Sequence, residues 1–166
     1  MNWNAIGAVA EIAGVVAVVI SVLYLAKQVK VGNDLNRTST FRDIMYGMTA
    51  HTNLMFGHEN INLMIKGLNG YDSLPAEEKL PFEHLIAGLF QYAEDSWNSS
   101  QVDLLGSDTM DNWSWFLKSK FFPYLGIREW WAAYKPAYAP DFQKWVDSIL
   151  QSADSHDDPY GIKHRD

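Results

Sequence analysis

Residues 5–26 form an almost unbroken apolar run, and Glu11 is the only charged residue within it. A helix of these 22 residues rises about 33 Å, close to the roughly 30 Å hydrocarbon thickness of a bilayer. The core helix of a soluble protein seldom stays apolar around its whole circumference over this length. The run therefore predicts a transmembrane helix rather than a buried core helix.

The residues that flank the run fit a membrane anchor. Trp3 and Tyr24 lie about 31 Å apart along a helix, so each ring would reach one membrane–water interface. Lys27, Lys30 and two arginines follow the run within about 20 residues, and no cation precedes it. We expect an uncleaved anchor in a bacterial inner (plasma) membrane, with the N-terminus outside and the C-terminal domain in the cytoplasm.

Glu11 places a carboxylate where lipid would surround it. Insertion of such a group near the bilayer centre costs about 3 kcal/mol, and each Val, Ile or Leu returns about 0.3–0.6 kcal/mol. Eleven such residues between positions 6 and 25 offset the cost. Glu11 is then either protonated or reaching outward with no task, or it faces a partner or an ion pathway.

Six small residues of the expected helix fall on one side of it. At about 100° per residue, an arc of about 120° holds Gly7, Ala10, Ala13, Gly14, Ala17 and Ser21. We call this set the small face, and Glu11 lies at its margin. Because small residues let helices approach closely in lipid, the pattern predicts a homo-oligomer packed through this face.

Two arrangements of the oligomer use Glu11 differently. In a closed ring, the Glu11 carboxylates would surround an axis near the outer mouth, with Ser21 deeper on the same path, and would favour cation conduction. In a dimer or a hetero-complex, Glu11 would hydrogen-bond to a group such as Ser21 or the backbone of a neighbouring helix and fix its register.

The N-terminal sequence also resembles a known pattern. The residues that carry the resemblance are Asn2-Trp3, Ala5-Ile6-Gly7-Ala8, Glu11-Ile12, Gly14, Leu23-Tyr24-Leu25-Ala26 and Gln28-Val29. They are similar to an uncharacterised family of short bacterial single-span membrane proteins with an N-terminal N-W-x-A-I-G-A-x-x-E-I-x-G anchor. The likeness continues through Asn33, Leu35 and Arg37 and, more loosely, through Trp130-Trp131 and Val146-Asp147. It implies that Glu11 belongs to a family pattern, and it implies no reaction.

Val29-Lys30 departs from the Ile-Arg pair that is usual in this family, although the interface charge is kept.

The rest of the chain shows apolar residues at helical spacing and no strand pattern of useful length. We expect helices at about residues 33–56, 61–68, 82–97, 107–121, 128–138 and 142–150. Ser73 could cap the third of these with Pro75 in its first turn, and Pro81 is expected to delay the regular helix until Phe82. The predicted fold class is all-α, one N-terminal transmembrane helix followed by a cytoplasmic bundle of four to five helices.

Three regions are expected: a transmembrane anchor at residues 1–30, a helical soluble domain at residues 31–151 and a polar tail at residues 152–166. The tail is either loose or docked as an extended arm. Residues 31–166 contain 19 acidic and 11 basic residues, which argues against binding to nucleic acid and against lying flat on anionic lipid.

Six of the seven tryptophans lie in the soluble domain. Trp113 with Trp115, and Trp130 with Trp131, cannot all point in one direction from a helix, so at least two should be exposed or meet a second surface. We expect these four residues to mark a subunit interface or, as the second choice, a ligand pocket.

Catalytic signals are weak. His51 and His58 lie seven residues apart but lack the spacing of a metal site, so both are expected to be ordinary surface histidines. The chain has no cysteine and no nucleophile, phosphate-binding or dinucleotide motif, so we predict no enzyme, no cofactor and no metal.

The sequence thus predicts a homo-oligomeric membrane protein that acts as an assembly or scaffold component. Its expected partners are the lipid bilayer and other copies of the chain. The alternatives are an oligomeric cation channel with an acidic ring at Glu11 and a membrane-tethered, ligand-sensing helical domain.

Overall fold

The computed structural model describes residues 3–154 and 157–163, and for residues 3–6 and 8–10 it describes the backbone alone. Every regular element in this part of the chain is a helix, which confirms the predicted all-α fold class. The chain divides into two compact units, Met1–Ser39 and Thr40–Asp166.

Helix α1 (Trp3–Met55) joins the two segments that the sequence predicted at residues 5–26 and 33–56. No proline occurs before Pro75, so every backbone N–H in this stretch can take part in helical hydrogen bonds. Gly32 does not end the helix, because a single glycine in a helix costs only about 1 kcal/mol. All side chains from Glu11 to Thr38 are exposed.

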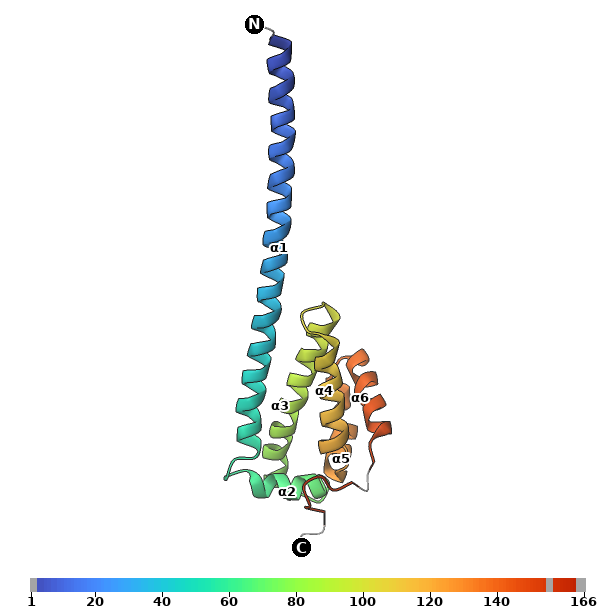
Figure 1. The fold of residues 1–166 in the computed structure, drawn as a ribbon. Helices are drawn as coiled ribbons and strands as arrows, with labels where there is room; N and C mark the ends of the chain where they lie inside the picture. The colour runs from blue at the N-terminus through green and yellow to red at the C-terminus, as the bar shows by residue number, and fades with distance from the viewer. Residues whose placement is uncertain (1–2, 155–156, 164–166) are drawn as a thin grey trace. The chain divides into compact units, whose positions relative to one another are not determined.

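The second unit is a bundle built on the end of α1 and five further helices of the described chain. These are α2 (Ile61–Asn69), α3 (Ala76–Gln101), α4 (Ser107–Phe116), α5 (Leu125–Tyr134) and α6 (Pro140–Ser152). A π-helical turn, Leu117–Phe121, follows α4, and a 3₁₀ turn, Lys135–Ala137, follows α5. Figure 1 shows α3 and α4 side by side, with α2 lying across the base of the bundle.

The start of α3 corrects the sequence prediction. The helix begins at Ala76 and contains Pro81, whereas we expected Pro81 to delay it until Phe82. Burial of Phe82 and of the apolar residues that follow it offsets the missing hydrogen bond of the proline. Ser73 does not cap the helix, since its hydroxyl donates to the carbonyl of Gly70 at 2.8 Å.

The last turns of α1 pack closely on α3. A Cβ atom at Gly88 would lie 2.3 Å from the ring of His51, and one at Gly47 would lie 2.7 Å from the ring of Tyr92. His51 Nε2 also lies 2.7 Å from the carbonyl oxygen of Leu85. Two glycines, one on each helix, therefore make room for aromatic rings of the other.

Helices α2 and α5 approach even more closely. A Cβ atom at Gly126 of α5 would lie 1.7 Å from the carbonyl oxygen of Gly67 in α2, and one at Gly67 would lie 2.2 Å from the ring of Phe82. Because the first of these contacts involves backbone, no side-chain rotation can relieve it. Arg128 supports the same region by donating hydrogen bonds to the carbonyls of Phe122, at 2.5 Å, and Ala153, at 3.0 Å.

Residues 157–163 of the predicted tail are docked on the helices of the second unit. The carboxylate of Asp158 accepts hydrogen bonds from the Tyr124 hydroxyl at 2.9 Å and from the N–H groups of Ile162 and Lys163 at 3.0 and 3.1 Å. Gly161 supplies the left-handed turn, with φ of +64°. This docked turn, which we call the tail clasp, buries Ile162 in the core.

The Asp158 carboxyl group of the tail clasp is ionised at neutral pH. Desolvation acts to raise the pKa of Asp158, but the hydrogen bonds from Ile162, Tyr124 and Lys163 outweigh it and lower the pKa below its usual value. Burial, together with the carboxylate of Asp158, raises the pKa of the Tyr124 phenol. The phenol therefore stays protonated and can donate.

Substitution of Gly126 by alanine tests the contact between α2 and α5. We expect Gly126→Ala to lower the free energy of unfolding by about 2 kcal/mol or more, because the new methyl group overlaps backbone that cannot move alone. The measurement is thermal unfolding of the full chain followed by near-UV circular dichroism. Gly106→Ala is the matched control, since nothing lies within 4 Å of its Cβ position. Equal melting temperatures for the two variants would contradict the contact.

Candidate functional site

The apolar part of α1 is the first candidate site. Among the described residues, α1 is the one helix long and apolar enough to cross a membrane, and its most apolar window has a mean hydropathy of 2.1 with none of it buried. Ile12, Val18 and Leu23 are each more than 60% exposed. These side chains are as apolar as those of a protein core, yet the structure provides no cover for them.

The small face is open along the described part of the helix. Cβ atoms built at Gly7 and Gly14 would meet nothing within 4 Å. The Ser21 hydroxyl donates to the carbonyl of Ala17 at 2.8 Å, so its polar hydrogen is satisfied within its own helix. The side chain of Ala10, which also belongs to the predicted small face, lies outside the described residues.

Glu11 is exposed at the edge of the small face. None of the ion pairs among the described residues involves it. A second helix packed against Gly7 and Gly14 could therefore approach this carboxylate without displacing a partner from it.

The structure describes the side chains of some of the predicted interface anchors. Tyr24 and Lys27 are exposed and, with Val31 and Leu35, line a groove on the surface of α1. Lys30 is exposed as well. The side chain of Trp3 lies outside the described residues.

The structure corrects the prediction for the tryptophan pairs. Trp130 and Trp131 are both 1% exposed and cannot form a surface, whereas Trp115 is 60% exposed and Trp113 is buried. Neighbouring tryptophans on α5 can both be buried because the helix has core on two sides. Phe90 of α3 lies 5.0 Å, between ring centroids, from each of the two indoles.

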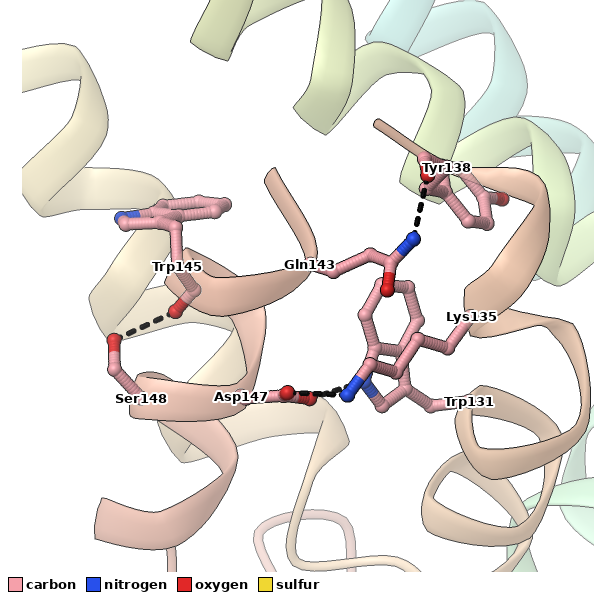
Figure 2. A network of polar contacts seen from close by, with 7 residues as sticks. All are labelled: Trp131, Lys135, Tyr138, Gln143, Trp145, Asp147 and Ser148. Carbon is pink, nitrogen blue, oxygen red and sulfur yellow. Dashed lines mark hydrogen bonds and ion pairs between the residues drawn. The ribbon is translucent and has the colours of Figure 1, made fainter. Parts of the chain in front are cut away.

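Trp131 also takes part in a polar contact with α6. Its indole N–H donates to Asp147 Oδ1 at 3.0 Å, and Lys135 Nζ donates to Asp147 Oδ2 at 2.5 Å (Figure 2). Desolvation acts to raise the pKa of Asp147, but these two hydrogen bonds outweigh it and lower the pKa. The carboxylate thus links α5 and α6 at the end of the aromatic core.

Trp113 and Trp115 line a groove of about 300 Å³ that also includes Phe41, Met45 and Met48 of α1. A subunit interface or ligand pocket therefore stays a prediction for Trp113 and Trp115 alone. Phe41 and Met45 are partly exposed on the same groove.

His51 and His58, the two histidines singled out in the sequence, differ in burial. His58 is exposed, but His51 is partly buried between α1 and α3, which differs from the expected surface position. No group of three or more histidine, aspartate or glutamate residues in the described part of the chain could hold a metal ion.

Some residues with structural roles gave no local signal in the sequence. The Lys135 partner of Asp147 lies 12 positions away in the sequence, and the Tyr124 partner of Asp158 lies 34 positions away. The only hint for Asp158 was the turn-forming Pro159 and Gly161 that follow it.

No family model matches the chain, and neither does any curated protein or solved structure. The resemblance of the N-terminal pattern to single-span membrane proteins therefore stays a prediction from the sequence.

Substitution of Asp147 tests the link between α5 and α6. Folding lowers the pKa of Asp147. The ionised side chain therefore contributes fully to the free energy of unfolding above the ordinary carboxyl pKa of about 4, and this contribution is lost as the pH falls through the lower pKa of the folded protein. We expect Asp147→Asn to cost about 1 kcal/mol at pH 7, a modest value because the pair is about one-third exposed. The difference should shrink below about pH 4.

The measurement is thermal unfolding of the full chain at a series of pH values. Asp141→Asn is the matched control on the same helix, because its ion pair with Lys144 is almost fully exposed. A cost for Asp147→Asn that stays constant between pH 7 and pH 2 would show that ionisation of Asp147 has no part in it.

Proposed function

We propose that the chain is a single-span membrane protein that self-associates through the small face of α1 and uses its helical bundle as an assembly or scaffold domain. The observation that carries the proposal is the exposure of the described apolar side chains of α1 from Glu11 onward, with none of the most apolar window buried. Transfer of such a segment from water into lipid removes a large apolar surface from water.

The energetics support insertion despite Glu11. The eleven Val, Ile and Leu residues between positions 6 and 25 together contribute about 3–7 kcal/mol, which offsets the cost of about 3 kcal/mol for one carboxylate. Lys27 and Lys30 follow the segment directly. They favour an orientation in which the helical bundle lies in the cytoplasm of a bacterial cell.

The small face supports self-association. Lipid gives no hydrophobic drive for helices to associate, so close packing and interhelical hydrogen bonds must replace it. The open surface at Gly7 and Gly14 allows a close approach of two backbones. Glu11, at the margin of that surface, would then hydrogen-bond to the neighbouring helix and fix its register.

Alkaline carbonate extraction tests membrane insertion. We expect the full chain to stay in the membrane fraction and to require detergent for release. Replacement of both Val16 and Val19 by aspartate adds two carboxylates at about 3 kcal/mol each, and should move the chain to the soluble fraction. The control replaces Tyr46 and Leu54, two exposed residues of α1 in the second unit, by aspartate. Release of the unmodified chain by carbonate would contradict insertion.

Disulfide crosslinking tests the small face, and the absence of cysteine from the chain makes single-cysteine variants free of background. We expect Ala17→Cys to form a crosslinked dimer in lipid nanodiscs under mild oxidation. Val19→Cys, at a similar depth but on the opposite side of the helix, should form little. Equal crosslinking at both positions, or none at either, would contradict packing through this face.

Glu11 distinguishes assembly from conduction. Native mass spectrometry of the nanodisc sample gives the number of copies, and a dimer of single helices cannot enclose a pore. We expect no cation flux into liposomes. A ring of five or more copies, with a cation flux that Glu11→Gln abolishes, would replace the assembly proposal with a channel.

A further inference from the structure

An apolar pocket of about 490 Å³ lies in the second unit and shares Phe116 with the groove that Trp113 and Trp115 line. Its walls come from four parts of the unit: Phe56 directly after α1, Ile61 and Ile65 of α2, Phe116 of α4, and Tyr160 and Ile162 of the tail clasp. The volume falls within the range of about 300–1,000 Å³ that is usual for small-molecule sites.

Hydrogen bonds hold the wall that the tail supplies. Asn69 donates a hydrogen bond to the carbonyl of Ile162 at 3.1 Å, and the N–H of Tyr160 donates to the Tyr124 hydroxyl at 2.9 Å. The rings of Tyr124 and Tyr160 are nearly parallel, with centroids 6.0 Å apart and an interplanar angle of 4°. Together with the Asp158 hydrogen bonds, these contacts preform the pocket.

The pocket offers few polar groups to a ligand. The Thr52 hydroxyl donates to the carbonyl of Met48 at 2.8 Å, so its hydrogen is already used within α1. The Tyr160 hydroxyl makes no hydrogen bond among the described residues. A ligand that fills the pocket must therefore be mostly apolar, since buried polar groups without partners are costly.

A cation lies beside the pocket. Lys120 Nζ is 5.5 Å from the centroid of the Tyr160 ring and 6.0 Å from that of Trp115, as expected for cation–π contacts. In the described part of the chain, Lys120 forms no ion pair with a carboxylate. Within a chain of net charge −7, this ammonium group can receive an anion without displacing an acidic side chain.

We propose that this pocket binds a monoacyl anion such as a fatty acid, with its chain between Phe56, Ile65 and Ile162 and its carboxylate at Lys120. The apolar walls select the chain and the ammonium group selects the anionic head. This site adds a ligand to the second unit and does not depend on whether α1 self-associates.

Photolabelling of the full chain in nanodiscs of phosphatidylcholine tests the proposal. The probe is a twelve-carbon fatty acid with a diazirine near the end of its chain, and labelled peptides are identified by mass spectrometry. We expect labels on α2 and on the end of α1, and competition by dodecanoate but not by dodecyltrimethylammonium. Labels confined to the apolar segment of α1, or equal competition by dodecanol, would overturn the proposal.

Substitutions test separately the contact with the acyl chain and the contact with the carboxylate of the ligand. Lys120→Gln should weaken labelling by about threefold, as expected for the loss of one partly exposed ion pair. Lys118→Gln, an exposed lysine of the same turn, is the matched control and should leave labelling unchanged. Ile65→Trp should fill the pocket and abolish labelling.

The melting temperature of each variant checks that it is folded. The label map of the unmodified chain decides the proposal even if Ile65→Trp fails to fold, because it locates the bound chain directly. A folded Ile65→Trp variant that labels normally, or equal effects of the two lysine substitutions, would overturn it.

Discussion

The surroundings that α1 requires between Glu11 and Thr38 are the main constraint on the molecule. All side chains in this stretch are exposed, and its first half has the composition of a protein core. In water such a surface would associate without specificity, because the hydrophobic effect has no direction. In lipid the same surface is matched to its surroundings, and Glu11 and the small face distinguish one side of the helix from another.

The second unit solves the opposite problem, since it must bury many large rings within a short chain. Phe90 contacts both Trp130 and Trp131, and Asp147 satisfies the indole N–H of Trp131. Gly47 and Gly88, at the contact of α1 with α3, leave room for the rings of Tyr92 and His51, and Gly67 of α2 leaves room for the ring of Phe82. In the bundle, a large side chain on one helix therefore packs against a glycine on a neighbouring helix.

Much of the fold follows from the sequence, because the helical spacing of apolar residues is a local signal, and so is a helix-breaking proline such as Pro123, which lies two residues after the turn Leu117–Phe121. The sequence was a poorer guide where tertiary packing overrides them, as at Pro81 within α3 and at Trp130, which is buried because α5 has neighbours on two sides. The small face could be predicted from the period of one helix. The apolar pocket could not, since Phe56 and Tyr160 meet only after the whole bundle has formed.

The tail clasp has a consequence for the order of folding. The hydrogen bond between Asn69 and Ile162 joins residues 93 positions apart, so its loop can close at low entropic cost only after the helices between them have packed. By the same reasoning it should be among the first contacts to open in the native protein, because it holds a short irregular segment rather than a helix. Access to the interior behind Tyr160 would then be controlled by local opening of a few residues, with the aromatic core intact.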